Sequence, residues 1–460
     1  MELEKAKVLV AKLAKEHKID VQNAWDILFF DEIILRLSRS NYKNIFVFKG
    51  GFYLQSVVGI ENRSTMDIDF KLIGNNLDNE KLYEVFNEVC LDKMDSNILF
   101  NILSIDDITA ETKYGGKTIK LEANFYNIKK RFGIDIGFGD VVTPNPIEYS
   151  YPLSYRKDEC KILAYPIETI IAEKFETLIS KGTMNSRSKD LYDLYLLNKT
   201  SYDVDLLNAA MVNTFNLRNT IYDYKAINDT LFEIFDFYRV EELYNNYSKK
   251  NKFANNVSFE MCKTAVYSIF DKLAFTEKIN LSDFQIELHL VRHGQDEQNK
   301  LGGWSDNHLT DIGKAEIIKL YDQLDVYDIF ISSDLQRVKE TSLIINDKLR
   351  MSIEFNPEFR EVNNGDLQNL TIEEFKSNYP GLYFSSLKMD EKYPNGESPQ
   401  EFYTRIQLAF KSLIDKNRSK KILLVTHGGV IAVILCLING YKYSNKLKIT
   451  PKTGTIIKLK

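Results

Sequence analysis

The sequence predicts a two-domain protein, with an α+β domain over residues 1–283 and an α/β domain over residues 284–460. A chain of 460 residues is too long for one ordinary core, because domains average about 150 residues. The polar stretch 278–283 interrupts the apolar pattern, and a buried-strand pattern restarts at 286–291. Short strands precede a long helical stretch before this break, whereas strands and helices alternate after it.

The first domain begins with residues 1–40, whose apolar positions recur at helical spacing and predict two helices. Apolar, β-prone residues then predict strands at 44–48, 68–72 and 134–136. From residue 167 to about residue 275 the pattern is helical. We therefore expect a small sheet followed by a helical bundle.

The second domain has strand patterns at 286–291, 329–331, 422–425 and 455–459, with helical stretches between them. This alternation is typical of a sheet covered by helices on both faces. A three-layer α/β/α domain is the expected result.

Composition favours a globular protein, with 44% hydrophobic and 27% charged residues. The apolar run 430–438 is too short to span a bilayer, and the mixed-charge N-terminus is unlike a secretory signal, so we expect a cytoplasmic protein without a membrane partner. A net charge of −5 argues against a broad basic surface. Cysteine spacing fits neither a zinc site nor a disulfide framework, and buried thiols are expected at Cys90, Cys160, Cys262 and Cys436.

Two strands of the second domain end in histidine. The strand at 286–291 leads into Arg292, His293 and Gly294, and the strand at 422–425 leads through Thr426 into His427. The carboxyl ends of strands in an α/β sheet open into a crevice where reactive groups are displayed. Two such histidines in a chain with five point to a shared site.

Further polar residues lie between these histidines. Arg337, in SSDLQR, falls on the first turn of an expected helix, and Glu361 follows an arginine in FREVNNGD. A neutral imidazole can attack phosphorus, guanidinium groups can hold the nonbridging oxygens, and a carboxylic acid can protonate the leaving oxygen. This chemistry requires no metal or other cofactor. His289 and His308 do not lie in motifs with such reactive residues and are expected to be structural.

The ordered motifs RHG, LTxxG (Leu309, Thr310, Gly313), SSDLQR, a glutamate after an arginine, and a late HGG resemble the histidine-phosphatase, or phosphoglycerate-mutase-like, superfamily over residues 286–460. The resemblance implies that His293 becomes a phosphohistidine and that Glu361 is the proton donor. It further implies that the phosphoryl group is bound by Arg292, Arg337 and His427, with Asn299 lining the same pocket.

Two departures from this family concern the substrate mouth. Asp296 stands where the family often has a small hydroxyl residue, and Asn363 and Asn364 replace bulkier residues before Gly365. Hydrolysis and mutase chemistry share the phosphohistidine and differ in what accepts the phosphoryl group. The stretch between Glu361 and His427 is short, whereas mutases tend to carry longer substrate-covering inserts, so hydrolysis of a phosphorylated small molecule is favoured.

The first domain contains a second group of candidate site residues. Gly50 and Gly51 end one expected strand, and glycines let backbone amides approach phosphates closely. Asp67 and Asp69 alternate on the next strand, so both carboxylates point to one face. A Mg²⁺ ion bridging the pair to a nucleoside triphosphate would offset their repulsion, and Asp135 is a candidate third carboxylate.

KGGxxL, an arginine before TxDxD, AEK and RxKDxxD resemble the AbiEii/AbiGii nucleotidyltransferases, toxins of the polymerase-β-like superfamily, over residues 40–200. The resemblance implies that Asp67 and Asp69 bind the catalytic metal, that Lys174 contacts the triphosphate and that Asp190 completes the site. Candidate substrate-binding residues in the same motifs are Lys49, Gly50, Gly51, Arg187 and Lys189. Phe52 departs from the family, which often has a small hydroxyl residue there.

These patterns together predict a bifunctional enzyme. One domain would transfer a nucleoside monophosphate from an NTP to an RNA, such as a tRNA end, or to a protein, and the other would hydrolyse a phosphomonoester. The resemblance to toxins implies a cognate antitoxin as a partner. An alternative is a phosphatase whose N-terminal domain is a non-catalytic module that binds the target, and a purely structural fusion is the least favoured interpretation.

Overall fold

The computed structural model describes residues 1–65, 67–74, 77–92, 96–108, 115–138, 142, 145–156, 158–185 and 187–460. The chain divides into two compact units, Met1–Leu273 and Ala274–Lys460. Residues after 273 belong to the second unit because Phe275 forms a β-bridge with Tyr441, and the amide of Ile279 donates to the carbonyl of Leu437 at 2.9 Å. This division lies before the polar stretch on which the expected 283/284 boundary was based.

The first unit contains a mixed sheet of seven strands among the described residues, in the order β3-β4-β5-β2-β1-β7-β6. The strands are β1 (Phe46–Lys49), β2 (Ile68–Leu72), β3 (Leu99–Asp107), β4 (Gly116–Phe125), β5 (Ile128–Gly137), β6 (Ile147–Leu153) and β7 (Asp158–Ala164). The strands predicted at 44–48, 68–72 and 134–136 correspond to β1, β2 and part of β5. The sheet is larger than predicted, because β3 and β6 expose many of their residues and therefore lack a continuous apolar signal.

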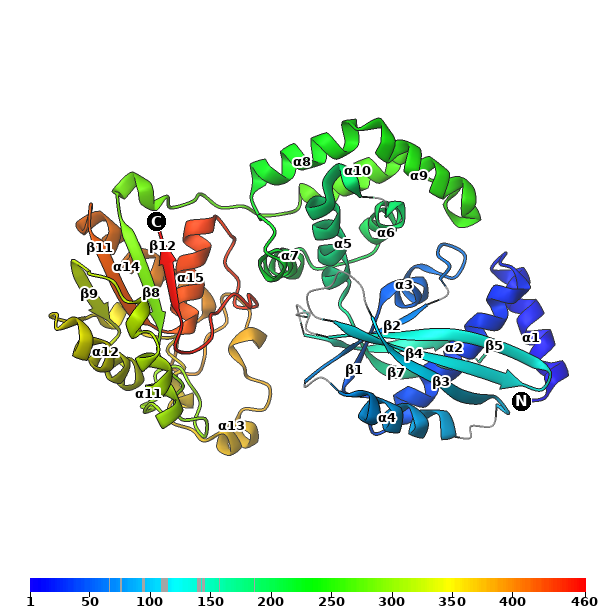
Figure 1. Cartoon of the computed structure of the whole chain (residues 1–460), viewed down its shortest axis with the longest axis horizontal. Helices are drawn as coiled ribbons and strands as arrows, with labels where there is room; N and C mark the ends of the chain where they lie inside the picture. The colour runs from blue at the N-terminus through cyan, green and yellow to red at the C-terminus, as the bar shows by residue number, and fades with distance from the viewer. Residues whose placement is uncertain are drawn as a thin grey trace. The chain divides into compact units, whose positions relative to one another are not determined.

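Among the described residues, four α-helices precede or alternate with the strands of this sheet along the chain, and six more come after its last strand (Figure 1). Those beside the sheet are α1 (Leu3–Glu16), α2 (Val21–Arg39), α3 (Gly50–Val58) and α4 (Asn79–Leu91). The first two confirm the helices expected in residues 1–40. The later helices form the expected bundle, drawn in green: α5 (Ile167–Lys181), α6 (Ser188–Asn198), α7 (Val204–Arg218), α8 (Tyr224–Asp236), α9 (Tyr238–Lys250) and α10 (Phe259–Phe270).

The second unit has a five-stranded sheet in the order β10-β9-β11-β8-β12, counted over a unit that is described without gaps. Its strands are β8 (Glu287–Arg292), β9 (Ile329–Ser332), β10 (Glu354–Phe355), β11 (Lys421–Thr426) and β12 (Ile456–Leu459). All neighbours pair in parallel except β12, which is antiparallel to β8. Its helices are α11 (Asp311–Ile318), α12 (Gln336–Leu349), α13 (Ile372–Asn378), α14 (Pro399–Lys416) and α15 (Gly428–Asn439).

Alternating strand residues build a core on each face of this second sheet. Leu288 and Leu424 belong to a cluster that includes residues of α14 and α15, whereas Val291 and Val425 belong to one that includes residues of α11 and α12. Because neighbouring strand residues point to opposite faces, helices cover the sheet on both sides. The three-layer α/β/α prediction is therefore confirmed.

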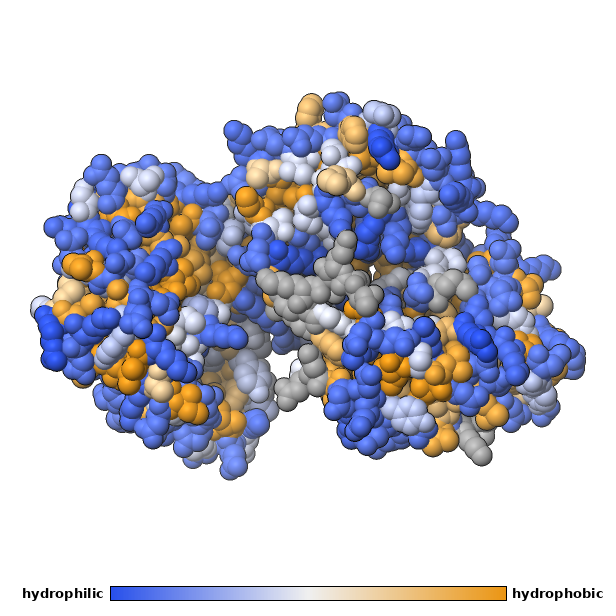
Figure 2. All heavy atoms as spheres, viewed as in Figure 1, coloured by the Kyte–Doolittle hydropathy of each residue, from blue (hydrophilic) through white to orange (hydrophobic). Residues whose placement is uncertain are grey.

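Hydrophilic residues cover most of the face of each unit seen in Figure 2, and hydrophobic residues occur between them. Among the described residues, no helix is both long enough and apolar enough to cross a membrane. The four cysteines are unpaired and buried, as predicted.

Candidate active sites

Strand register places the two strand-end histidines together. In the parallel pairing of β8 with β11, Arg292 lies opposite Thr426, so His293 and His427 are the next residues on adjacent strands. The amide of His293 donates to the carbonyl of Thr426 at 3.1 Å. The centroids of the two imidazole rings are 5.4 Å apart. The pair forms part of one site at the carboxyl edge of the sheet.

The hydrogen bond at Nδ1 of His293 determines which nitrogen can react. Nδ1 lies 2.8 Å from the carbonyl oxygen of Gly294, which can only accept, so Nδ1 carries the proton and Nε2 keeps its lone pair. Burial of the ring, with the positive charge of Arg337, lowers the pKa of His293 to about 3. The imidazole is therefore neutral near pH 7 and is suited to nucleophilic attack.

His427 is also held in its neutral form. Burial and the charge of Arg337 lower the pKa of His427 well below its ordinary value. Arg337 Nη2 donates to Nδ1 of His427 at 3.2 Å, which leaves the Nε2 proton to be donated to Ser333 Oγ at 2.9 Å. His427 is thus a fixed polar group and not a cation.

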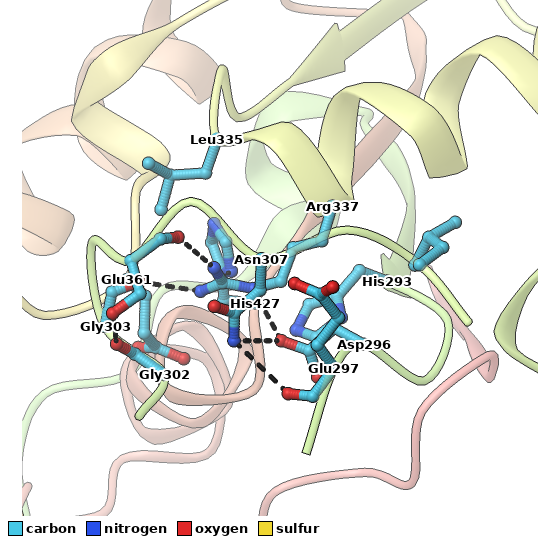
Figure 3. Close-up of polar contacts among 12 residues, drawn as sticks. His293, Asp296, Glu297, Gly302, Gly303, Asn307, Leu335, Arg337, Glu361 and His427 are labelled. Atoms are coloured by element: carbon cyan, nitrogen blue, oxygen red, sulfur yellow. Dashed lines mark hydrogen bonds and ion pairs between the residues drawn. The ribbon is translucent and has the colours of Figure 1, made fainter. Parts of the chain in front are cut away.

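Two guanidinium groups supply the positive charge. Arg337, on α12, is buried and donates to the carbonyls of Ser305 at 3.0 Å and Gly303 at 2.7 Å (Figure 3). Arg292 donates from Nη1 to the carbonyl of Pro451 at 2.6 Å. The Nε atoms of both arginines are buried and, within the described residues, have no hydrogen-bond partner. Unsatisfied buried donors are costly, so both groups are suited to an anion.

Glu361 is positioned by the start of α15. Its Oε2 accepts a hydrogen bond from the amide of Gly429 at 3.1 Å. A Cβ atom at Gly429 would lie 2.3 Å from Glu361 Oε1, so only glycine allows this approach. The indole of Trp304 donates to the carbonyl of Glu361 at 2.6 Å and fixes the backbone there.

His427 and the two arginines lie beside His293, and Glu361 interacts electrostatically with Arg337. One predicted residue is placed differently. Asn299 is exposed, and its carbonyl accepts from the amide of Ile372 at 3.0 Å. The asparagine that is buried in the site is Asn307, which donates to Asp296 Oδ2 at 3.2 Å (Figure 3). Asn307 was not predicted because it lies in an irregular loop, and the only sequence signal was its position two residues before the LTxxG motif.

The lowered pKa of His293 has a kinetic consequence. Because the pKa is about 3, the imidazole stays unprotonated as the pH falls through 6.5, where an ordinary histidine gains its proton. We expect kcat for an aryl phosphate not to fall as it would if His293 gained a proton between pH 7 and pH 4.5. A loss of kcat with an apparent pKa near 6.5, in protein shown by circular dichroism to be folded, would contradict this.

In the first unit, strand register aligns three predicted residues across the sheet. Lys49 of β1 pairs with Asp69 of β2, and Asp69 pairs with Asp135 of β5. They face a cavity of about 950 Å³. Every residue predicted for the nucleotidyltransferase site lines this cavity: Lys49, Gly50, Gly51, Asp67, Asp69, Asp135, Lys174, Arg187, Lys189 and Asp190.

The two glycines are required by close approaches. Gly50 has φ +76°, and a Cβ atom there would lie 1.9 Å from Asp69 Oδ2. A Cβ atom at Gly51 would lie 2.9 Å from Thr65 Oγ1. Phe52 is 2% exposed and packs edge-on against Phe30, with ring centroids 5.0 Å apart. Phe52 is therefore a core residue of the helix that the glycines begin.

Carboxylates crowd one side of this cavity. Burial raises the pKa of Asp69, and the negative charges of Asp135 and Asp67 raise it further, whereas Lys49 lowers it. Asp135 Oδ1 accepts a hydrogen bond from Thr118 Oγ1 at 2.6 Å. The arrangement leaves mutual repulsion that a bound cation would relieve.

On another wall of the cavity, buried charges form a network. Lys174 Nζ donates to Asp190 Oδ1 at 2.9 Å and to Asp193 Oδ2 at 2.7 Å. Arg63 Nε donates to Asp193 Oδ1 at 2.8 Å, and Arg187 Nε lies 2.9 Å from Asp190 Oδ2. The predicted residues Lys174 and Asp190 are thus joined by Arg63 and Asp193, which stand in the motifs but were not predicted as site residues.

One further group, Glu287, His289 and Asp325, has possible metal-ligating atoms close together within the described residues. Lys421 Nζ lies 3.0 Å from Glu287 Oε1 and 2.7 Å from Asp325 Oδ2, so both carboxylates already have a counter-charge. His289 Nδ1 is 2.8 Å from the hydroxyl of Tyr327. These contacts fit a structural cluster at the start of β8.

Comparison with known proteins matches each unit to a family. Residues 32–260 match the family described as nucleotidyl transferase AbiEii toxin, type IV TA system, and residues 288–460 match the histidine phosphatase superfamily (branch 1). Phosphoglycerate mutase-like protein 4 of Arabidopsis thaliana is 34% identical over 156 residues, which cover 32% of this chain and 67% of that protein. Uncharacterized phosphatase PhoE of Bacillus subtilis is 31% identical over 156 residues, covering 33% of this chain and 76% of that protein.

Among solved structures, a mycobacterial glucosyl-3-phosphoglycerate phosphatase aligns with a TM-score of 0.32 and 20% identity, over 38% of this chain and 89% of that one. Fold, site and relatives define an enzyme with two domains of different classes. The chain belongs to the histidine phosphatase superfamily through its C-terminal domain, and its N-terminal domain is of the AbiEii nucleotidyltransferase toxin type. Both family resemblances seen in the sequence are confirmed.

Proposed function

We propose that the chain is a bifunctional enzyme. Its C-terminal domain hydrolyses a phosphomonoester through a phosphohistidine at His293, and its N-terminal domain transfers a nucleoside monophosphate from an NTP to an RNA or protein acceptor. The observation that carries the proposal is the neutral His293, with Nε2 unprotonated, beside two arginines whose Nε donors have no hydrogen-bond partner in the described residues. Among these residues, Arg337 Nε has only the ion-pair contact with Asp296 at 3.5 Å. A nucleophile and an anion cradle in one buried site suit phosphoryl transfer.

The phosphatase reaction has two steps. Nε2 of His293 forms a bond to phosphorus as the ester P–O bond breaks, and Glu361 gives its proton to the leaving oxygen. Water then attacks the phosphohistidine, Glu361 takes a proton from that water, and the P–N bond breaks to release phosphate. Arg292 and Arg337 stabilise the charge on the nonbridging oxygens, and neutral His427 accepts from Arg337 and holds that guanidinium group in the site.

Water, and not a second substrate hydroxyl, is the proposed phosphoryl acceptor. Between Glu361 and His427 the structure has helices α13 and α14 joined by a segment with a short 3₁₀ turn, Phe384–Ser386. The stretch between Glu361 and His427 is therefore short compared with the substrate-covering inserts of mutases, and this favours hydrolysis. A phosphorylated small molecule is the proposed substrate class.

The oxygen donors of the first unit fit Mg²⁺. Asp67, Asp69 and Asp135 are carboxylates, which hard divalent cations prefer, and the pKa of Asp69 is raised partly by its two like-charged neighbours. Asp67 and Asp69, with Asp135, would hold the ion, which would supply charge neutralisation for a triphosphate. Lys49, Arg187 and Lys189 line the same cavity and add positive charge for the phosphates.

The acceptor and partners follow from the family of the N-terminal domain. An RNA such as a tRNA end, or a protein hydroxyl, is the proposed acceptor, and a cognate antitoxin is the proposed binding partner of this toxin-type domain. The proposed setting is the cytoplasm, where NTPs and both kinds of acceptor occur.

Transfer from an NTP is the direct test of the N-terminal half. We expect the full chain with Mg²⁺ and an α-labelled NTP to label RNA or protein from a cell extract, and we expect Asp67→Ala to lose at least about a hundredfold of this labelling, because it removes a metal-binding carboxylate. The charge-matched control is Glu84→Ala, an exposed change on α4. Equal labelling by the Asp67→Ala and unaltered chains would favour the target-binding module instead.

A further inference from the structure

Asp296 places a negative charge inside the proposed phosphoryl site. Its Oδ2 is 3.5 Å from Arg337 Nε, and its side chain is only 15% exposed. Asn307, itself 1% exposed, donates to the same Oδ2 at 3.2 Å and holds it in place (Figure 3). The family that the sequence resembles often has a small hydroxyl residue at this position. The carboxylate therefore changes the charge of the site.

The number of cations around the phosphoryl position is small. His293 and His427 are neutral because burial and the arginines lower the pKa of each. The positive charge near them comes from Arg292 and Arg337, and Arg337 already faces Asp296. A bound anion must therefore compete with Asp296 for this guanidinium group.

We propose that Asp296 is a specificity-determining residue that makes the site disfavour doubly charged phosphoryl groups and select singly charged ones. The inference rests on the proposed phosphatase function and names the charge state of the group that this site binds. A fixed carboxylate beside the phosphoryl oxygens repels a dianion more strongly than a monoanion. Weak retention of inorganic phosphate, the dianionic product, is a second consequence.

Phosphate esters allow this selection to be measured, because their second ionisation occurs near pH 6. Above that pH an ester becomes mainly dianionic, so the KM of the unaltered enzyme for an aryl phosphate should rise between pH 5 and pH 8. In Asp296→Asn and Asp296→Thr the rise should disappear, and KM at pH 8 should be lower by about tenfold or more. Asparagine matches the size of aspartate, and threonine restores a small hydroxyl.

Binding of inorganic phosphate gives a readout that needs no turnover. Titration calorimetry at pH 8 should show a Kd at least about tenfold lower for Asp296→Asn than for the unaltered chain. The matched control is Glu297→Gln, which removes a neighbouring negative charge that pairs with Lys300 at 3.9 Å. This control should leave both the phosphate affinity and the pH dependence of KM unchanged.

The outcomes separate this inference from the function on which it rests. If aryl phosphates are hydrolysed but Asp296→Asn changes neither the slope of KM with pH nor the Kd for phosphate, Asp296 does not select charge and the inference is wrong. Equal gains in affinity from Glu297→Gln would also overturn it, because general charge would then explain the effect. Tighter phosphate binding by Asp296→Asn without any hydrolysis would support the anion site and contradict the phosphatase proposal.

Discussion

Replacing His293 with alanine is expected to lower kcat for aryl phosphates by at least about a thousandfold, because the reaction loses its nucleophile. The change should leave folding intact, since the ring makes its polar contact with the adjacent Gly294 carbonyl and the strand pairing uses backbone atoms. Steady-state hydrolysis measured over pH 5–8 checks the result.

The matched control is His308→Ala. His308 belongs to the same domain but is exposed and pairs with Glu340 at 2.6 Å. We expect this variant to keep its phosphatase activity. Residual activity above a few per cent in His293→Ala, with unchanged KM, would show that another group attacks phosphorus.

The largest expected effect on stability comes from Asp193→Ala. Asp193 is fully buried and accepts hydrogen bonds from Arg63 at 2.8 Å and Lys174 at 2.7 Å. Removing this carboxylate leaves two buried cations with less counter-charge, and breaking a buried ion pair from one side costs about 3–5 kcal/mol. The free energy of unfolding of the N-terminal unit should fall by about this amount in urea titrations of the full chain.

The exposed variant Glu84→Ala serves as the control, because Glu84 pairs with Lys81 on the surface of α4. Its unfolding transition should coincide with that of the unaltered chain. An unchanged urea midpoint for Asp193→Ala would mean that solvent or a rearranged Asp190 compensates both cations, and the expected contribution of Asp193 to stability would be wrong.

Strands buried on both faces were the predictable part of the fold. β11 and β1 were found because most of their residues are apolar. β8 and β2 were found because their apolar residues lie among a few polar ones in short, mostly buried segments. β3, β4 and β6 mix exposed polar with buried residues, and the two-residue β10 is exposed, so periodicity had little signal to detect. The two units divide after Leu273 and not at the expected 283/284 boundary. The segment after Leu273 is polar in sequence, yet it pairs with residues of the second unit.

The candidate sites were predictable where motifs lie at the ends of strands. Strand pairing brings His293 beside His427 and Asp69 beside Asp135. The sequence indicated these residues because each lies in or just after a predicted strand. The loop between Gly294 and Leu309 has no helical or strand period, so periodicity did not distinguish the exposed Asn299 from the buried Asn307. Likewise, a motif lists charged residues but does not reveal that Lys174 is enclosed by two carboxylates.

Chemical trapping of the intermediate tests the central claim most directly. The full chain would be mixed with a radiolabelled phosphate ester, quenched within milliseconds to seconds, and digested to locate the label. The account predicts a label that is stable in base and labile in acid, on the peptide that contains His293, and its absence from His293→Ala. A label that survives acid, or one that persists in His293→Ala, would contradict the account, as would hydrolysis without any phosphohistidine.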